Sequence, residues 1–376
     1  MFKRFTKSRA ATAAETDVVR KSVLDLAVRL AAAVVAVAAA LAVGQGSTAS
    51  AKEGFKSPTL ENGVLTVNGT NSSDAIALRL KALTRDVLQV DFGDDGTADF
   101  EFNTEVLRQI TVEAGNGDDA VRIDESNGVF SDAIPTTLDG GNGNDSLTGG
   151  SGAGTLRGGN GNDRLAGGNG NETLLGGNGD DSLDGNKGAD IGVMGNGDDA
   201  FTWDPGDGSD IVEGQNGHDT MVFNGAPAAE HFDLSAVGRR LLFFRDVGQI
   251  TMDTDGVEQV DATTLGGADV VTVNDLSATD VREVNIDLAA SLGGAAGDGL
   301  IDRVVVNGTK GNDTIDVSGD AGGVSVTGLA ATVNVRHAEA AHDRLEINTV
   351  AGTDSITSTG LAAGVIKLFV DGTLVP

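Results

Sequence analysis

The sequence predicts an all-β fold in which short strands and tight turns alternate along the chain as a solenoid. A nine-residue pattern repeats nine times over residues 140–222, with glycine at its fourth place, usually an acid at its sixth and an aliphatic residue at its eighth. The 376 residues include 55 Gly and only 4% aromatic residues, a composition that argues against a large compact core. Strand-like segments broken by glycine-rich turns continue on both sides of the repeat.

Each nine-residue unit is interpreted as a turn followed by a very short strand. In residues 140–148, Gly141 and Gly143 permit positive φ, so six residues can turn tightly and direct several backbone carbonyls inward. The last three residues, Ser146-Leu147-Thr148, alternate polar and apolar, as in a strand with one inward side chain. Repetition of this unit gives turn, strand, turn, strand, which is the chain path of a solenoid.

The turns offer oxygen ligands. Inward carbonyls and a carboxylate at the sixth place form a hard, oxygen-only donor set, which suits calcium rather than zinc or copper. We therefore predict Ca²⁺ as the cofactor. Because alternate units stack on the same side, one side collects Asp145, Asp163, Asp181, Asp199 and Asp219, and the other collects Glu172, Asp190 and Asp210. The predicted ligand turns also contain the fourth-place glycines Gly143, Gly161, Gly179 and Gly197.

The unit matches G-G-x-G-x-D-x-U-x and resembles the RTX, or haemolysin-type, calcium-binding repeat. The resemblance implies a right-handed parallel β-roll, in which two consecutive units form one coil and each calcium ion lies between turns of successive coils. Several positions depart from the pattern. They are Gly154 in place of an acid, Gly192 in place of an aliphatic residue, Met194, Pro205 and Gln215 in place of glycines, and a two-residue insertion at Trp203-Asp204.

The flanking segments contain worn copies of a related unit. Residues 67–78 and 306–317 share Val-Asn-Gly-Thr followed at equal offsets by an acid and two aliphatic residues. Residues 269–274, 302–307 and 343–348 echo one another at spacings of 33 and 41, which predicts larger coils. We predict four parts: an export signal (1–51), an N-terminal β-rich region (52–137), a calcium-binding β-roll (138–224) and a C-terminal β-solenoid (225–376).

Apolar burial alone is a weak stabiliser of the repeat. Burial of one inward aliphatic side chain per unit stabilises the fold by roughly 2–3 kcal/mol, whereas the conformational entropy lost when the backbone of nine residues is ordered costs roughly 9–18 kcal/mol. The net charge is -30, and it becomes -34 without the seven basic and three acidic residues of the first 51. Such a chain is a poor partner for nucleic acid. The chain has no Cys, so bound metal rather than disulfide bonds is expected to stabilise the fold.

The first 51 residues are predicted to direct export. Basic residues such as Lys3, Arg4 and Arg29 precede an uncharged apolar run over residues 30–43, and Ala49-Ser50-Ala51 follows it. Cleavage after Ala51 would release a secreted protein. The alternative is a membrane anchor, but the 14-residue run is shorter than the roughly 20 residues that a spanning helix needs. We expect no stable membrane span after cleavage.

Two further motifs are predicted to be structural. Residues 91–96 resemble the start of an EF-hand loop, but Gly93 occupies the third place and Phe102 the twelfth, so a turn is favoured. His337 and His342 are five residues apart, whereas a helical zinc site of the H-E-x-x-H type needs four. Neither segment is predicted to bind a metal.

The sequence therefore predicts a secreted calcium-binding protein with a structural role or a role in interactions with the cell surface or extracellular matrix, and no enzymatic activity. The alternative is an extracellular β-helix enzyme, a lyase or epimerase that acts on acidic polysaccharides. Such an enzyme should gather basic residues in a groove to bind its substrate. The few Lys and Arg of this chain are instead spread thinly.

Overall fold

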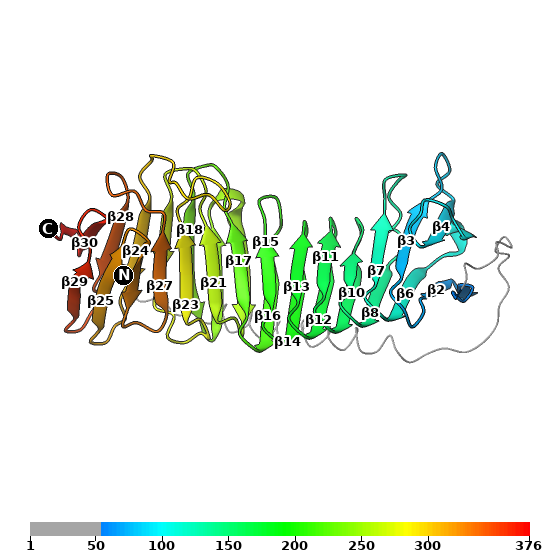
Figure 1. Ribbon diagram of the computed structural model, residues 1–376, viewed down its shortest axis with the longest axis horizontal. Coiled ribbons are helices and arrows are strands. Elements are labelled where there is room, and N and C mark those ends of the chain that lie inside the picture. Colours follow the sequence, from blue (N-terminus) through cyan, green and yellow to red (C-terminus); the bar gives the residue numbers. More distant parts are fainter. Residues whose placement is uncertain (1–53) are drawn as a thin grey trace, which may run out of the picture. The chain divides into compact units, whose positions relative to one another are not determined.

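The computed structural model describes residues 54–376, which fold into two long β-sheets (Figure 1). In spatial order, the first sheet consists of β1 (Thr59–Glu61), β2 (Val64–Asn68), β6 (Gln109–Asn116), β8 (Thr136–Asn142), β10 (Gly154–Asn160), β12 (Thr173–Asn178), β14 (Ile191–Asn196), β16 (Ile211–Asn216), β20 (Ile250–Asp255), β19 (Arg240–Arg245), β18 (His231–Val237), β22 (Val270–Val273), β24 (Arg303–Asn307), β28 (Arg344–Asn348), β30 (Lys367–Val370) and β31 (Thr373–Leu374).

The second sheet, also in spatial order, consists of β29 (Ser355–Leu361), β25 (Thr314–Asp320), β26 (Gly323–Thr327), β27 (Thr332–Arg336), β23 (Glu283–Asp287), β21 (Gln259–Thr263), β17 (Thr220–Asn224), β15 (Ala200–Trp203), β13 (Ser182–Asn186), β11 (Arg164–Gly168), β9 (Ser146–Thr148), β7 (Ala120–Asp124), β3 (Ala75–Leu80), β4 (Val87–Phe92) and β5 (Phe100–Asn103). Two short 3-10 turns, η1 (Thr104–Val106) and η2 (Val247–Gln249), complete the elements of the described residues.

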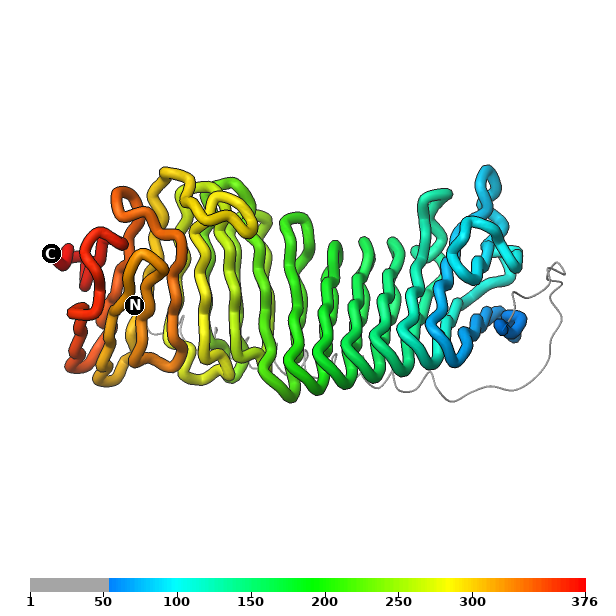
Figure 2. Tube along the Cα trace, viewed as in Figure 1, coloured from blue at the N-terminus to red at the C-terminus, as the bar shows by residue number. Residues whose placement is uncertain are grey.

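From β8 to β17 the chain passes alternately from one sheet to the other, so two nine-residue units make one coil. Strands of successive coils pair in parallel, with equivalent residues in register. Leu156 lies opposite Leu138 and Leu174 in the first sheet, and Leu165 lies opposite Leu147 in the second. The turns line up along two edges of the stack (Figure 2). The predicted all-β solenoid with a parallel β-roll is confirmed.

The eighth-place side chains form the core between the sheets. Leu147, Leu156, Leu165 and Leu183 are all fully buried. The glycine at the eighth place of one unit, Gly192, leaves room that a neighbour fills, because a Cβ there would stand 2.6 Å from Phe201 Cε2. The enlarged side chain of Phe201 thus compensates for a departure from the repeat pattern, and the coil keeps its register.

Outside the β-roll the coils are larger and contain antiparallel insertions. The hairpins β3–β4–β5, β18–β19–β20 and β25–β26–β27 each interrupt the parallel order of a sheet. The three echoed segments nevertheless stack in register, with Val270 opposite Arg303 and Arg303 opposite Arg344. The predicted larger coils with spacings of 33 and 41 residues are therefore confirmed. The four-part division of the chain stays a prediction.

Aromatic residues join the β-roll to the C-terminal coils. The indole of Trp203 stacks on the ring of Phe223 with a centroid distance of 4.2 Å, and Phe243 packs against Phe223 at 4.3 Å. The guanidinium of Arg245 lies 5.1 Å from the Trp203 ring centroid. The same guanidinium forms a buried ion pair with Glu230, so the junction is held by apolar contact and by paired charges.

The EF-hand-like segment, residues 91–96, begins with the last two residues of β4 and continues into the predicted turn. Asp91 is fully buried and its Oδ2 is 2.8 Å from the guanidinium of Arg79. Asp94 is bound by Arg122, at 2.6 and 2.7 Å. His337 Nδ1 lies 2.6 Å from Asp287 Oδ1. The predicted export signal lies outside the described residues. Within residues 54–376, no helix is long and apolar enough to span a membrane.

Candidate calcium sites

The sixth-place acids of one side form a continuous row. The backbone N–H of Asp145 donates to Oδ1 of Asp163 at 2.7 Å, and the N–H of Asp163 donates to Oδ1 of Asp181 at 2.8 Å. The same bond joins Asp181 to Asp199 and Asp199 to Asp219. All five predicted acids are at most 2% exposed. We call this set, together with the acid described next, the first acid row.

Sequence reasoning missed one member of this row. Asp119 donates its N–H to Oδ1 of Asp145 at 2.8 Å and is itself buried. It belongs to residues 114–122, Ala-Gly-Asn-Gly-Asp-Asp-Ala-Val-Arg, in which Gly115 and Gly117 have φ of 115° and 119°. Ala114 replaces the first glycine, and 26 rather than 18 residues separate Asp119 from Asp145. The spacing G-x-G-x-D was the signal that could have revealed it.

The other side carries a shorter row, which we call the second acid row. Glu172 donates its N–H to Oδ1 of Asp190 at 2.6 Å, and Asp190 donates to Oδ1 of Asp210 at 2.8 Å. All three are at most 2% exposed. Gly154, which precedes Glu172 in the stacking order, contributes no carboxylate. The assignment of alternate units to two sides thus matches the stacking that the structure shows.

In all of these acids except Asp210, one carboxylate oxygen has no hydrogen-bond partner among the described residues. Oδ1 accepts the inter-coil bond, whereas the Oδ2 atoms of Asp145, Asp163, Asp181 and Asp199 are buried without a hydrogen-bond partner. The same holds for Asp119, Asp190 and Asp219. In Glu172, Oε1 is unpaired and Oε2 accepts the N–H of Gly168 in its own turn at 2.9 Å. A buried, unpaired anionic oxygen is costly. A repeated set of them is a donor set suited to a cation.

Backbone carbonyls of one coil lie close against the glycines of the next coil. A Cβ added at Gly159 would overlap the carbonyl oxygen of Gly141, and one added at Gly161 would overlap that of Gly143. These are the second and fourth places of stacked units, where Gly159 and Gly161 have φ of 116° and 119°. Glycine is needed there for both the positive φ and the close approach. In the described residues, no three acidic or histidine side chains converge on one point.

The carbonyls and the free carboxylate oxygens together fit calcium, which takes oxygen ligands from backbone and carboxylates in flexible geometry. Both kinds of oxygen recur in successive coils of the first acid row. The predicted glycines Gly143, Gly161, Gly179 and Gly197 stack in sequence, each with its Cα against the carbonyl of the preceding coil. The donor chemistry therefore agrees with the predicted cofactor.

Burial raises the pKa of these carboxyl groups. Loss of solvent raises the pKa of Asp145 and Asp163 to about 6 and that of Asp181 to about 7. Desolvation, with repulsion from Asp210 and Glu172, raises the pKa of Asp190 to about 8. Without a cation, these sites favour the protonated form.

Two degenerate copies of the unit show how the fold provides hydrogen bonds to both oxygens of the sixth-place acid without an ion. Thr70 stands at the second place and donates its N–H and its hydroxyl to the two oxygens of Asp74, at 2.6 and 3.1 Å. Thr309 does the same for Asp313, at 2.7 Å for each bond. Glycine at the second place, as in Gly141, has no hydroxyl to donate. The threonine turns thus need no metal ion, whereas the glycine turns leave an oxygen free.

The first acid row ends at Asp219. Glu213 pairs with Asp255 of the next coil, and Thr220 pairs with Gln259. The turn between Glu213 and Thr220 advances the chain by seven positions, whereas the turn between Asp255 and Gln259 advances it by only four. The shorter turn therefore has no residues that stack on the residues just before Asp219. The N–H of Asp219 donates to Oε2 of Glu258 at 2.8 Å.

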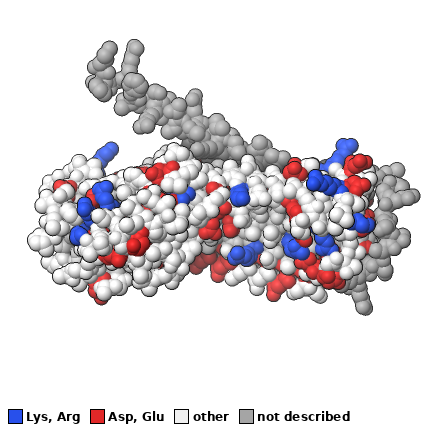
Figure 3. All heavy atoms as spheres, turned by 90° about the horizontal axis from the view of Figure 1, so that it is seen from above, with Lys and Arg blue, Asp and Glu red and all other residues white. Residues whose placement is uncertain are grey.

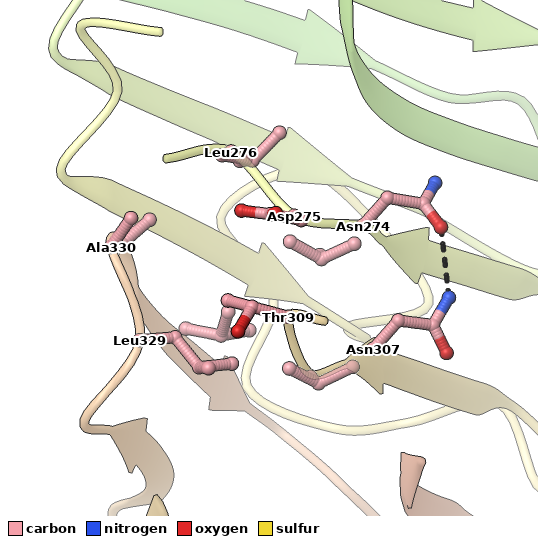
Figure 4. A pocket seen from close by; sticks show the side chains of 11 residues that line it. Asn274, Asp275, Leu276, Asn307, Thr309, Leu329 and Ala330 are labelled. Carbon is pink, nitrogen blue, oxygen red and sulfur yellow. Dashed lines mark hydrogen bonds between the residues drawn. The ribbon is translucent and has the colours of Figure 1, made fainter. Parts of the chain in front are cut away.

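The pocket in Figure 4 is small, and no Lys or Arg lines it. Figure 4 shows a cavity of about 10 Å³ that is lined by Asn274, Asn307 and Leu329 among others. It has room for about one water molecule, and the Asn307–Asn274 side-chain bond runs along it. Figure 3 shows Lys and Arg interspersed with Asp and Glu along one face.

A family model of the RTX calcium-binding nonapeptide repeat (4 copies) matches residues 136–165, 166–201 and 206–225. These segments therefore belong to that repeat family, and they contain every predicted ligand. Asp119 lies outside the matched segments. A search of curated proteins found no match to the chain.

Proposed function

We propose that this chain, a calcium-binding β-roll protein that carries RTX repeats, is a secreted protein of the cell surface or extracellular matrix. Its role would be structural, or to present a stiff acidic surface to matrix components. The observation that carries the proposal is the stack of buried, unpaired carboxylate oxygens in successive glycine-rich turns. When these acids are ionised, a fold that buries so many of them needs a cation to offset their charge.

We assign the calcium ligands to the first and second acid rows. In the first row the ligands would be Oδ2 atoms and the carbonyls of second- and fourth-place glycines, and we include Asp119 because its Oδ2 is also unpaired. Bound calcium supplies positive charge that keeps the carboxylates ionised. The chain itself positions them, because each Oδ1 is held by the N–H of the preceding coil. The glycines keep the carbonyls close enough to share a gap.

Calcium binding would then supply the stability that the sparse core lacks. Extracellular modules bind calcium with dissociation constants of roughly 0.1–1 mM, so ion at about ten times that level contributes roughly 1.4 kcal/mol per site. Four sites would contribute roughly 5–6 kcal/mol, comparable with the stability of a whole domain. Calcium outside the cell could therefore switch this segment from unfolded to folded.

Calcium titration of residues 52–376, followed by circular dichroism and calorimetry, tests the proposal. We expect excess EDTA to remove much of the β signal and calcium to restore it, whereas magnesium should restore little because it prefers a rigid octahedral site. A spectrum and melting temperature that do not change between EDTA and calcium would refute calcium-dependent folding.

Export is tested separately. The basic, apolar and small-residue order of the first 51 residues supports cleavage after Ala51. Mass spectrometry of protein from the culture medium should find an N-terminus at Lys52 or within a few residues of it. Recovery of the full-length chain only in membranes would show that the segment is an anchor.

A further inference from the structure

A row of asparagines at the third place of the units runs along the same edge as the first acid row. Side-chain amides link Asn142 to Asn116, Asn160 to Asn142 and Asn178 to Asn160 at 2.7–2.8 Å. Asn196 and Asn216 continue the row at 2.8 and 2.9 Å. We call these six residues the asparagine row.

Every member of the asparagine row precedes the fourth-place glycine of its unit. In an Asn-Gly pair, the glycine nitrogen can attack the asparagine side chain, because glycine offers little steric hindrance and much backbone freedom. The new N–Cγ bond closes a cyclic imide as the Cγ–Nδ2 bond breaks. The amide leaves as ammonia with the proton from the glycine nitrogen. Water then opens the imide to an aspartyl or isoaspartyl residue.

The stacked coils restrain both reacting groups. The N–H of Gly143 donates to the carbonyl of Asn160 at 2.8 Å, and that of Gly161 donates to the carbonyl of Asn178 at 2.8 Å. The side-chain oxygen of each inner asparagine accepts the amide of the next, as Asn160 Oδ1 does from Asn178. Attack on Cγ therefore requires at least one inter-coil bond to break.

Asn216 lacks these restraints. Its amide donates to Asn196 Oδ1, but within the described residues its own Oδ1 accepts no hydrogen bond and the N–H of Gly217 donates none. The cause is the shortened turn of the next coil, which leaves residues 215–218 exposed. Gln215 in this turn also has φ of 79°, a conformation that favours glycine.

We infer that Asn216 is a site of spontaneous deamidation and the first position at which the asparagine row is chemically modified. The product places a carboxylate, or an isoaspartyl link with a longer backbone, in the turn that leads to Asp219. This inference rests on hydrogen bonding between coils and on the shortened turn. It therefore holds whether or not calcium is the cation that the acid rows bind.

Peptide mapping by mass spectrometry tests the inference on the full secreted chain, incubated over time in calcium at mildly alkaline pH. Fragmentation within each peptide would locate the converted residue. We expect Asn216 to convert about tenfold faster than Asn160 or Asn178, since local opening must precede reaction at the inner positions. Equal or slower conversion at Asn216 would overturn the inference.

Two controls keep the result specific. Asn216→Gln should abolish the early signal, because glutamine forms the corresponding imide far more slowly; a signal that persists in this variant would assign the modification elsewhere and overturn the inference. Wild-type chain opened in denaturant should convert all six asparagines at similar rates. A large excess at Asn216 under that condition would show that local sequence, not the coil stack, selects the site.

Discussion

At the residue scale, each Asp of the first acid row has two oxygens with different roles. Oδ1 of Asp163 holds the N–H of Asp145 at 2.7 Å, whereas its Oδ2 has no hydrogen-bond partner. Asn in place of Asp would keep a side-chain oxygen as acceptor but remove the charge. Ala would remove both. Substitution can therefore separate the stacking role of these side chains from their proposed role as calcium ligands.

We predict that Asp163→Ala lowers calcium stoichiometry and thermal stability more than Asp190→Ala does. Asp163 lies between two aspartates in the longer row. Asp190 also lies between two acids, Glu172 and Asp210, but it belongs to the shorter row, which begins without an acid at Gly154. Loss of two sites corresponds to roughly 3 kcal/mol in calcium. Calorimetric titration and melting curves measure both effects.

Asp163→Asn is the matched control, and it should lose calcium sites while it retains more stability in EDTA than Asp163→Ala. An equal or larger loss from Asp190→Ala would show that the assignment of strong and weak sides is wrong.

A pair of glycines tests whether the close approach of a backbone carbonyl in the adjacent coil is needed for calcium binding. Gly161 and Gly206 both have φ of 119°, but a Cβ on Gly161 would overlap Gly143, whereas one on Gly206 would meet nothing within 4 Å. Both alanine variants carry the positive-φ penalty of about 1 kcal/mol. Gly161→Ala should cost a further 1–3 kcal/mol, roughly, through overpacking, and should lose a calcium site. Calcium titration and melting curves of the two variants measure both effects. Equal calcium stoichiometry and equal stability of the two variants would show that this close approach does not contribute to the site.

At the scale of elements, the period of the repeat was enough to predict the strands, their inward residues and the two sides of the β-roll. Features that depend on residues from different coils were not predictable in this way. The ring of Phe201 fills the space above Gly192, and Asp119 joins the first acid row across a 26-residue separation. The hairpins around β19 also escaped prediction, because their strands carry no repeat period and pair antiparallel.

Trp203 is the only tryptophan of the chain, and we predict that its fluorescence reports folding of the last β-roll coil. Its indole N–H donates to the Gly208 carbonyl at 2.7 Å and its ring stacks on Phe223. Adding calcium to EDTA-treated protein should shift its emission to shorter wavelength as the indole becomes buried. Asp210→Asn, in the same turn, should move the midpoint to higher calcium. An emission maximum that stays constant during the titration would contradict coupling of this coil to calcium.

At the scale of the whole molecule, the acidic composition and the fold are linked. The net charge of -30 opposes compaction by self-repulsion. The acid rows place part of this charge at buried positions, one in each successive coil. The arginines at the junction and N-terminal hairpin neutralise some acids within the chain, as Arg245 does for Glu230 and Arg79 for Asp91. Among the described residues, the acids of the two rows have no such ion-pair partner, so the stability of this segment depends on solution conditions.

We therefore predict opposite pH dependences in EDTA and in calcium. Burial raises the pKa of Asp163 to about 6, that of Asp181 to about 7 and that of Asp190 to about 8, whereas an unfolded Asp titrates near about 4. The calcium-free fold thus binds protons more tightly than the unfolded chain. Its stability is greatest below about pH 4 and falls as the pH rises through about 6–8. Calcium instead requires ionised ligands, so its stabilisation grows over the same range.

Melting temperatures measured between about pH 5 and pH 8 test this reversal. In EDTA the melting temperature should fall with rising pH, and in saturating calcium it should rise. Asp163→Asn should flatten both trends, because it removes one titrating group that has two neighbouring acids in the row. If stability rose with pH in EDTA as it does in calcium, the carboxylates would be stabilised within the chain itself, and neither acid row would need a cation.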